Sequence, residues 1–199
     1  MKSISTQAFE NAVKTLRQGG VVLFPTETSY GLAADATDVQ AVRRVFEIKG
    51  RSLDKTVPLI AASFAMAEKY LRLSRSLRTL AKIYWPGALT IVAPVQSASL
   101  LASGVVRDGT IALRVSSHPL AQRLSQALGR PITATSANRS GEPACYSVPA
   151  FLRQQKSLKP DAVLDAGTLP KRIPSTIVTE KDNQLIVLRQ GGLKLKPSA

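Results

Sequence analysis

The sequence predicts an α/β fold in which one mixed β-sheet is flanked by helices. Apolar runs alternate with segments of helical periodicity for nearly the whole chain, which is typical of strands separated by helices. The last apolar runs are short and follow one another without a helix, which indicates antiparallel pairing. A length of 199 residues fits one large domain, so we expect residues 1–199 to form a single folded unit.

The first elements are marked by caps and stops. Residues 6–18 carry apolar side chains at helical spacing and end at a Gly-Gly pair, so they predict a helix. The apolar run VVLF at 21–24 predicts a buried strand. A second helix is predicted over 38–48, where Asp38 is an N-cap residue and Gly50 a helix stop.

The rest of the chain continues the alternation. A Pro-Gly turn at 86–87 precedes an apolar run, and Pro119 and Gly129 delimit another helix. The predicted elements are a strand at 57–62, helices at about 63–72 and 74–84, strands at 88–95 and 110–116, a helix at 119–128, a strand at 131–136, a short helix near 149–156, and strands near 162–165, 175–179 and 184–189.

Charge is the most unusual property of the composition. The chain has 27 Lys and Arg against 13 Asp and Glu, a formal net charge of +14. Such an excess favours an anionic partner, whether nucleic acid, nucleotide or phosphorylated substrate. A solvated basic face explains most of the local clusters individually.

The sequence shows neither a membrane span nor a secretory signal nor a pair of cysteines, and these features bear on where the protein is located. No apolar run approaches the roughly 20 residues needed to span a bilayer, and the first residues form an amphipathic pattern instead of a secretory signal. Cys145 is the single cysteine, which excludes an intrachain disulfide and fits a reducing compartment. We therefore expect a soluble cytoplasmic protein without membrane contact.

Hydroxyl side chains gather in two loops that follow apolar runs. These loops are FPTETSYG at 24–31 and ITATSANRSG at 132–141. Ligands of α/β sheets bind where strands end, and hydroxyl groups can donate to carboxylate or phosphate oxygens. A hydrophilic turn with Tyr30 as a packing residue explains the first loop equally well.

Cations continue this pattern. Lys49, Arg51 and Lys55 lie at the end of a predicted helix and in the loop beyond it. The helix dipole, worth about 0.3–1 kcal/mol, explains Lys49 but not the other two. Arg114 lies on an apolar strand, where it is either an edge residue or a buried guanidinium that needs an anion, and ligand binding is slightly preferred. Further polar residues at strand ends are Ser175, Thr176 and Arg189.

Several chemistries are disfavoured. The chain has neither a P-loop nor a Gly-x-Gly-x-x-Gly motif. His118 is the only histidine, which disfavours a zinc site, and its place before Pro119 fits a cap or surface role better than a catalytic triad. The carboxylates are scattered, at Glu27, Asp35, Asp54 and Asp165. Hydroxyls, amides and cations without a nucleophile suit phosphoryl or nucleotidyl transfer.

Eight blocks of the sequence resemble the YrdC/TsaC family, the L-threonylcarbamoyladenylate synthases. The blocks occur in the order and approximate spacing of that family and cover about residues 7–192. They are FPTETSYGLAADA, KGR, WPGALT, ALRVSSHP, TATSANRSGEP, DAG, PSTIV and LRQGG.

The resemblance implies both a fold and a reaction. The fold is YrdC-like, a twisted mixed sheet around a positively charged cavity, with the two hydroxyl-rich loops as opposite walls. In the reaction, a nucleotidyl transfer, ATP, bicarbonate and L-threonine give L-threonylcarbamoyladenylate and pyrophosphate. Other proteins then pass the threonylcarbamoyl group to tRNA (the t6A37 modification), so tRNA and these proteins are expected as transient partners. No tightly bound cofactor is implied, and Mg²⁺ is expected to arrive with ATP.

The resemblance also implies roles for individual residues. The L-threonine contacts are Thr28, Arg114 and Ser175, and Arg114 would hold the carboxylate. The ATP contacts are Lys49, Arg51, Lys55, Thr110, Ser136, Asn138 and Arg189. Lys49 and Arg51 form a Lys-x-Arg motif expected to neutralise the leaving group during catalysis, and Ser136 and Asn138 form a Ser-x-Asn motif.

The chain departs from the family at a few places. Ser52 stands where many relatives have Pro, which changes loop stiffness more than chemistry. The stretch ACYS at 144–147 replaces a Ser-Pro-Thr-like stretch, so no nucleotide contact is assigned there. A short basic tail at 193–199 leaves no room for the extra domain of longer relatives, so we expect the short bacterial type.

Two other functions fit parts of the pattern. A non-catalytic module that binds double-stranded RNA or tRNA would explain the charge, and would need an outer stripe of cations at Arg43, Arg44, Arg72, Arg75 and Arg78. An enzyme instead needs Lys49, Arg51, Lys55, Arg114 and Arg189 inside one pocket. Related domains also occur in carbamoyltransferases of hydrogenase maturation, but these are embedded in longer chains.

Overall fold

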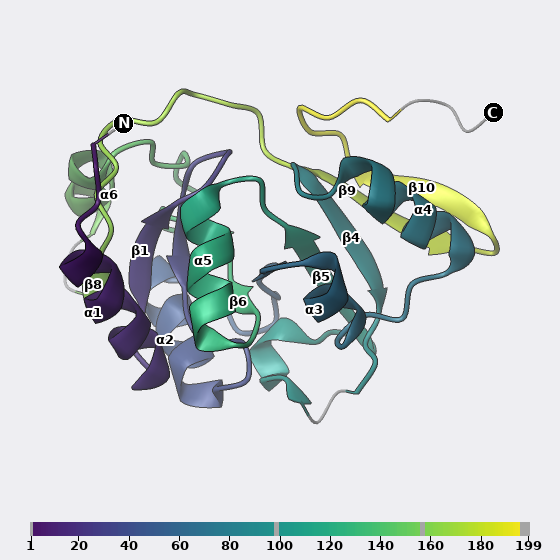
Figure 1. Cartoon of the computed structure of the whole chain (residues 1–199), viewed down its shortest axis with the longest axis horizontal. Helices are drawn as coiled ribbons and strands as arrows, with labels where there is room; N and C mark the ends of the chain where they lie inside the picture. The colour runs from purple at the N-terminus through teal and green to yellow at the C-terminus, as the bar shows by residue number, and fades with distance from the viewer. Residues whose placement is uncertain (1, 98–99, 156–157, 196–199) are drawn as a thin grey trace.

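The computed structural model describes residues 2–97, 100–155 and 158–195, and its strands form two mixed sheets (Figure 1). The four-stranded sheet contains β1 (Val22–Pro25), β2 (Tyr30–Ala33), β7 (Thr135–Ser136) and β8 (Ala162–Val163) in the order β7-β2-β1-β8. The six-stranded sheet contains β3 (Leu59–Ala61), β4 (Leu89–Pro94), β5 (Thr110–Val115), β6 (Ile132–Thr133), β9 (Thr176–Lys181) and β10 (Gln184–Arg189) in the order β10-β9-β4-β5-β3-β6. The predicted mixed α/β class is confirmed, whereas the expectation of one sheet is wrong.

The second sheet arises where one predicted strand divides. The run at 131–136 forms β6, which pairs with β3, and then β7, which pairs with β2. Ala134 lies between them, and its N–H donates to the carbonyl of Pro58 at 2.8 Å. The same stretch of chain therefore belongs to both sheets in turn, which apolar patterning does not reveal.

The helices cover the sheets and join them. The helices are α1 (Thr6–Arg17), α2 (Val39–Lys49), α3 (Phe64–Glu68), α4 (Arg75–Tyr84), α5 (Pro119–Leu128), α6 (Val148–Gln154) and the 3₁₀ turn η2 (Ser103–Val105). α5 contacts both β1 and β3 and so bridges the two sheets, with α1 beside it (Figure 1). α3 contacts β5 and α4 contacts β4. The helix predicted at 63–72 is much shorter, because α3 ends at Glu68.

Caps account for the helix boundaries that the sequence predicts well. The carboxylate of Asp38 accepts from the N–H groups of Gln40 at 2.8 Å and Ala41 at 3.0 Å, which opens α2. Gly50 closes α2 in the left-handed conformation, with φ of 56°. Because the helix ends there, Lys49 and Arg51 leave the backbone on either side of a sharp turn.

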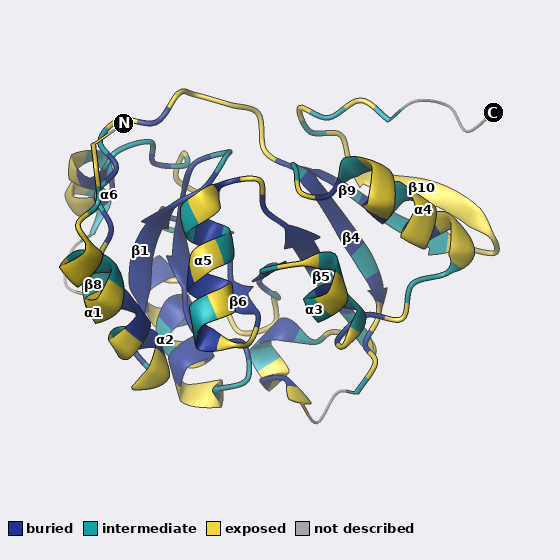
Figure 2. Ribbon diagram, viewed as in Figure 1, coloured by how far each residue is buried: buried dark blue, intermediate teal, exposed yellow. Residues whose placement is uncertain are grey.

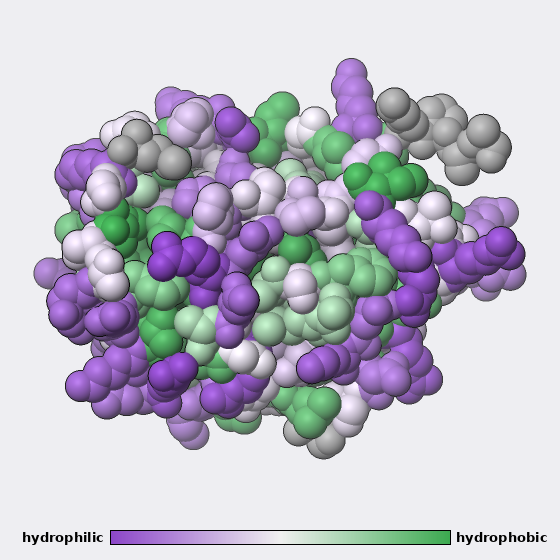
Figure 3. Space-filling model, in the orientation of Figure 1, coloured by the Kyte–Doolittle hydropathy of each residue, from purple (hydrophilic) through white to green (hydrophobic). Residues whose placement is uncertain are grey.

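The apolar core lies in three clusters. One packs α3, α4 and η2 on the six-stranded sheet, one packs α2 and α6 on the four-stranded sheet, and the third lies among α1, α5 and the neighbouring strands. The central strands are buried and β10 is exposed along its whole length (Figure 2). The face seen in Figure 3 is largely hydrophilic, with apolar side chains in patches near α3 and between α1 and α5. Among the described residues, no helix is both long and apolar enough to cross a membrane.

Candidate active site

A cavity of about 420 Å³ lies between the two sheets. This volume is in the range of small-molecule sites, roughly 300–1,000 Å³. Its lining residues are Thr26, Thr28, Ser29, Tyr30, Gly31, Arg51, Thr56, Pro58, Thr90, Val92, Ala112, Arg114, Ala134, Thr135, Ser136, Ala144, Tyr146, Arg172, Pro174, Ser175, Ile177, Leu188 and Arg189.

One wall is a face of the six-stranded sheet. Thr90 and Val92 of β4, and Ala112 and Arg114 of β5, line the cavity at every second position. Side chains alternate between the faces of a strand, so the residues between them point to the apolar core under α3 and α4. The sheet therefore has one face for packing and one for the cavity.

The opposite wall contains both hydroxyl-rich loops. β2 and β7 are paired strands, with Gly31 opposite Ser136 and Leu32 opposite Thr135. The expectation that the two loops form opposite walls is therefore wrong, because backbone pairing places them side by side. The wall facing them carries Arg114 instead.

The first loop is held by its own hydroxyl groups. The Thr26 hydroxyl accepts from the N–H groups of Thr28 at 3.2 Å and Ser29 at 3.3 Å, and lies 2.7 Å from the Ser29 carbonyl oxygen, to which it donates. Thr28 Oγ1 is 3.1 Å from Thr26 Oγ1 and lines the cavity. A compact turn thus presents the Thr28 hydroxyl, the predicted threonine contact, to the cavity.

Arginine dominates the charge of the cavity. Arg51, Arg114, Arg172 and Arg189 line it, and no carboxylate is among its lining residues in the described ranges. Arginine keeps its charge in proteins and donates in a planar fork that matches carboxylate and phosphate groups. The cavity is therefore suited to an anionic ligand.

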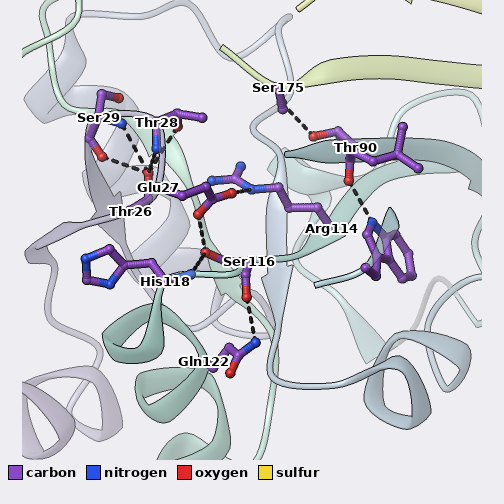
Figure 4. Close-up of polar contacts among 12 residues, drawn as sticks. Thr26, Glu27, Thr28, Ser29, Thr90, Arg114, Ser116, His118, Gln122 and Ser175 are labelled. Atoms are coloured by element: carbon purple, nitrogen blue, oxygen red, sulfur yellow. Dashed lines mark hydrogen bonds and ion pairs between the residues drawn. The ribbon is translucent and has the colours of Figure 1, made fainter. Parts of the chain in front are cut away.

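Arg114 is buried and paired with an acid. Its Nε donates to Glu27 Oε1 at 2.9 Å, and the two side chains are 5% and 8% exposed (Figure 4). Glu27 also accepts a short hydrogen bond from the hydroxyl of Ser116. Of the two alternatives that the sequence left open for Arg114, the structure shows the buried guanidinium and not the edge residue, and Glu27 of the protein itself supplies an anionic partner.

The other predicted arginines are held by backbone oxygens. Arg51 donates from Nη2 to the Thr56 carbonyl at 3.0 Å, while its buried Nε has no hydrogen-bond partner among the described residues. Arg189 donates from Nη2 to the Ser175 carbonyl at 2.8 Å. Partial burial of the guanidinium group lowers the pKa of Arg51 and also that of Arg189, although β10 is exposed as a strand, and Arg114 lowers the pKa of Arg189 further. An anion in the cavity would offset the repulsion between Arg114 and Arg189.

Lys49 lies beneath the cavity instead of in its wall. Its ammonium donates to the carbonyl of Asn138 at 3.0 Å, to Asn138 Oδ1 at 3.2 Å, and to the carbonyl of Ser136 in a short hydrogen bond. Burial lowers its pKa to about 8, with a further contribution from Arg51. Lys49 therefore joins the Lys-x-Arg and Ser-x-Asn motifs by holding the turn at 136–138.

The structure brings together six of the predicted contacts. Thr28, Arg51, Arg114, Ser136, Ser175 and Arg189 line the cavity, whereas Lys49, Lys55, Thr110 and Asn138 do not. Lys55 is exposed, Asn138 is buried under the turn, and Thr110 lies at the far end of β5, where its hydroxyl donates to the Arg107 carbonyl at 2.8 Å. Along a strand, the four-residue step from Thr110 to Arg114 spans about 13 Å.

Sequence reasoning missed four residues of this site. Arg172 lines the cavity from the segment between β8 and β9, and its guanidinium has no hydrogen-bond partner among the described residues. Thr90 shares a hydrogen bond with Ser175, at 2.8 Å between hydroxyl oxygens (Figure 4). Tyr146 lines the cavity although its stretch departs from the family pattern. Glu27 was counted only among the scattered carboxylates, and no role at the site was predicted for it.

Other candidate residues have structural roles. His118 caps α5 by accepting from the Leu120 N–H at 3.3 Å, as predicted, and is buried, not on the surface. Burial lowers its pKa. Cys145 is a buried free thiol. Within the described ranges, no group of three or more His, Cys, Asp or Glu side chains is arranged to hold a metal ion.

The fold and the cavity define an α/β protein with an arginine-lined site between two sheets. The sequence profile of the Sua5/YciO/YrdC family, described as "Telomere recombination", matches residues 14–191. The chain belongs to this family.

Two similar proteins are named for the same activity. A threonylcarbamoyl-AMP synthase of Vibrio vulnificus is 39% identical over 186 residues, covering 92% of this chain and 97% of the relative. One from Pyrococcus abyssi is 37% identical over 184 residues, covering 91% of this chain and 53% of the relative, so the chain spans about half its length. A crystal structure of P. abyssi Sua5 complexed with L-threonine superposes with a TM-score of 0.88 at 35% identity, covering 96% of this chain and 56% of that one.

Proposed function

We propose that the protein makes L-threonylcarbamoyladenylate and pyrophosphate from L-threonine, bicarbonate and ATP. The observation that carries the proposal is the convergence of Arg51, Arg114 and Arg189 on one cavity that is also lined by threonine and serine residues. The names of the relatives from Vibrio and Pyrococcus support the same reaction. Positioning and charge neutralisation would carry most of the catalysis, as in other transfers to and from phosphate.

The chemistry would proceed in two steps. The amine of threonine attacks the carbon of bicarbonate and water is lost, which gives a carbamate. A carbamate oxygen then attacks the α-phosphorus of ATP, and the bond to pyrophosphate breaks. The enzyme would thus be a nucleotidyltransferase, and Mg²⁺ would arrive with ATP and be held chiefly by its phosphates.

The cavity suggests how the substrates divide it. Arg114 would take the threonine carboxylate with its terminal amino groups, and the hydroxyls of Thr28 and Ser175 would complete the threonine site. Arg51, Arg172 and Arg189, which line the cavity, would face the phosphates. Lys49 would act by holding Ser136 and Asn138 in place. Thr110 and Lys55 would need a rearrangement to reach ATP.

A role in RNA binding alone is less well supported by the positions of the cations. Arg43 pairs with Glu47, Arg44 with Asp161 and Arg78 with Glu68. Arg43 and Arg44 lie on α2 and Arg78 on α4, and these helices are well apart in Figure 1. The outer stripe that an RNA-binding module would need is therefore interrupted and partly neutralised. Transient contact with tRNA and with threonylcarbamoyl-transfer proteins in the cytoplasm remains part of the proposal.

The test is pyrophosphate release from ATP and bicarbonate by the purified protein, with and without L-threonine. We expect release that depends on threonine and is lost in Arg114→Ala. The proposal would be overturned by pyrophosphate release at the same rate with and without L-threonine. It would also be overturned if no pyrophosphate were released and the protein bound RNA in a salt-sensitive way.

A further inference from the structure

Glu27 makes the most deeply buried ion pair of the described residues. Of the seven ion pairs among them, the pair with Arg114 is the one in which both side chains are less than a tenth exposed. Glu27 lies in the turn between β1 and β2, and Arg114 lies on β5, so the pair joins the two sheets at the side of the cavity that Arg114 lines. Removing one partner of such a pair leaves a buried charge without compensation, so the geometry of the other depends on it.

The glutamate is itself held from behind. Ser116 donates its hydroxyl hydrogen to Glu27 Oε2, while its oxygen accepts from the N–H of His118 at 3.2 Å (Figure 4). The carbonyl of Ser116 accepts from Gln122 Nε2 at 2.7 Å. These bonds fix the direction of the Ser116 hydroxyl, because its oxygen already accepts and its one hydrogen must go to the carboxylate. The start of α5 thereby orients Glu27.

The pair leaves most of the Arg114 donors unused. Arginine has five N–H donors, and Glu27 takes the one on Nε. Within the described part of the chain, the terminal amino groups of Arg114 have no hydrogen-bond acceptor, and Arg114 lines the cavity. A guanidinium fixed at Nε can present its terminal amino groups to a carboxylate in a bidentate pair.

We infer that Glu27 is a positioning residue, which fixes the Arg114 guanidinium so that it binds the carboxylate of an α-amino acid. The inference rests on the proposed function, because the amino acid is its substrate L-threonine. Glu27 touches none of the three substrates and acts through Arg114. Ser116 supports it by fixing the second carboxylate oxygen.

Charge and geometry predict opposite effects when Glu27 is replaced by Gln. If Glu27 only lowered the positive potential of the cavity, its neutralisation would strengthen binding of the threonine carboxylate. If it positions Arg114, binding weakens, because the neutral amide oxygen of Gln holds the Arg114 Nε–H less strongly than a carboxylate does. The Ser116 hydroxyl would also have to turn, since it would accept from the Gln NH₂ group instead of donating to a carboxylate oxygen.

The experiment measures the KM of L-threonine and of ATP for pyrophosphate release in wild type, Glu27→Gln, Arg114→Gln and the double variant. We expect Glu27→Gln to raise the threonine KM about tenfold, the effect of one lost charge-assisted hydrogen bond, with the ATP KM within about twofold of wild type. If Glu27 acts through Arg114 and not through its chain neighbour Thr28, the double variant should be no worse than Arg114→Gln. Ser116→Ala should raise the threonine KM by a smaller factor.

A matched control separates positioning from stability. Asp35 is also a buried carboxylate that pairs with an arginine, Arg130, at 2.8 Å, but it does not line the cavity. Asp35→Asn should lower the melting temperature without changing the threonine KM. L-threonine binding by titration calorimetry gives the same comparison for any variant too slow to assay.

Each outcome bears on the inference. A lower threonine KM in Glu27→Gln, equal rises in both KM values, or additive effects in the double variant would overturn it while leaving the proposed function intact. If wild type neither binds threonine nor releases pyrophosphate in a threonine-dependent way, the proposed function fails and this inference fails with it.

Discussion

Replacing Lys49 by Met should change the free energy of unfolding in a way that depends on pH. Relative to wild type, the Lys49→Met variant should be more stable at neutral pH than in alkaline solution. The pKa of Lys49 falls from 10.5 to about 8, first because burial disfavours the ammonium and second because Arg51 is near. This pKa difference means that folding disfavours the charged form of Lys49, relative to its neutral form, by about 3 kcal/mol. The three oxygens that accept from Lys49 offset the burial only in part.

The pH dependence of the free energy of unfolding follows from this difference. Below about pH 8, the folded protein carries a buried ammonium that the unfolded chain would hydrate, so Lys49 destabilises the fold. Between about pH 8 and 10.5, the unfolded chain binds a proton that the folded protein does not, so the free energy of unfolding rises with pH. From about pH 7 to about pH 9.5, wild type should gain about 2 kcal/mol relative to Lys49→Met.

Urea unfolding at these two pH values measures the effect, by comparing wild type with Lys49→Met. Lys82→Met removes an exposed lysine of α4 and controls for the loss of one positive charge. If the difference between wild type and Lys49→Met is the same at both pH values, Lys49 titrates like an exposed lysine and the reasoning is refuted. Lys49→Met should also lose activity, because the turn at 136–138 loses the ammonium that holds it.

Two further predictions concern the cavity wall. Arg172→Ala should raise the ATP KM about fivefold, as expected for one partly exposed phosphate contact, and leave the threonine KM unchanged; its neighbour Lys171, which does not line the cavity, provides the control Lys171→Ala. Equal effects of the two variants on the ATP KM would contradict this role. Tyr30→Phe should lower the free energy of unfolding by about 1–3 kcal/mol, because the Tyr30 hydroxyl accepts from the buried Ala166 N–H at 2.9 Å and donates to the Gly167 carbonyl at 2.8 Å. Tyr146→Phe, which loses one exposed hydrogen bond of 3.3 Å, should cost less in urea unfolding, and the reverse order would refute the assignment.

Local signals in the sequence were enough for most helices and for the apolar strands. Asp38 and Gly50 set the ends of α2, and Pro119 and Gly129 those of α5, because capping depends on neighbouring residues alone. β2 was missed: its segment follows a polar turn and contains Gly31, which favours a loop. Pairing with both β1 and β7 makes it a strand, and the close approach of the Phe24 ring leaves Gly31 little room for a side chain.

The site was predictable as a set of residue types but not as a set of contacts. A buried guanidinium that needs an anion was one of two interpretations of Arg114, yet its partner Glu27 lies 87 residues away in the chain and was counted among scattered acids. Lys49 and Arg51 are separated by one glycine and were given one role. The left-handed turn at Gly50 sends one beneath the turn at 136–138 and the other to the cavity. Such divisions depend on tertiary packing, which composition and spacing do not encode.

The geometry of the cavity follows from two connections between the sheets. The first is covalent, since β6 and β7 are consecutive in the chain and belong to different sheets. The second is the buried Glu27–Arg114 pair, which joins the turn after β1 to β5. With both in place, the wall that carries Thr28 and Ser136 has a fixed distance from the wall that carries Arg114. The cavity is therefore organised before a ligand binds, and binding free energy need not be used to align the arginines.

Arg172 differs from the other lining arginines, because its guanidinium has no partner among the described residues and it lies on a segment without helix or strand. Any adjustment to the size of the ligand should therefore come from this side of the cavity.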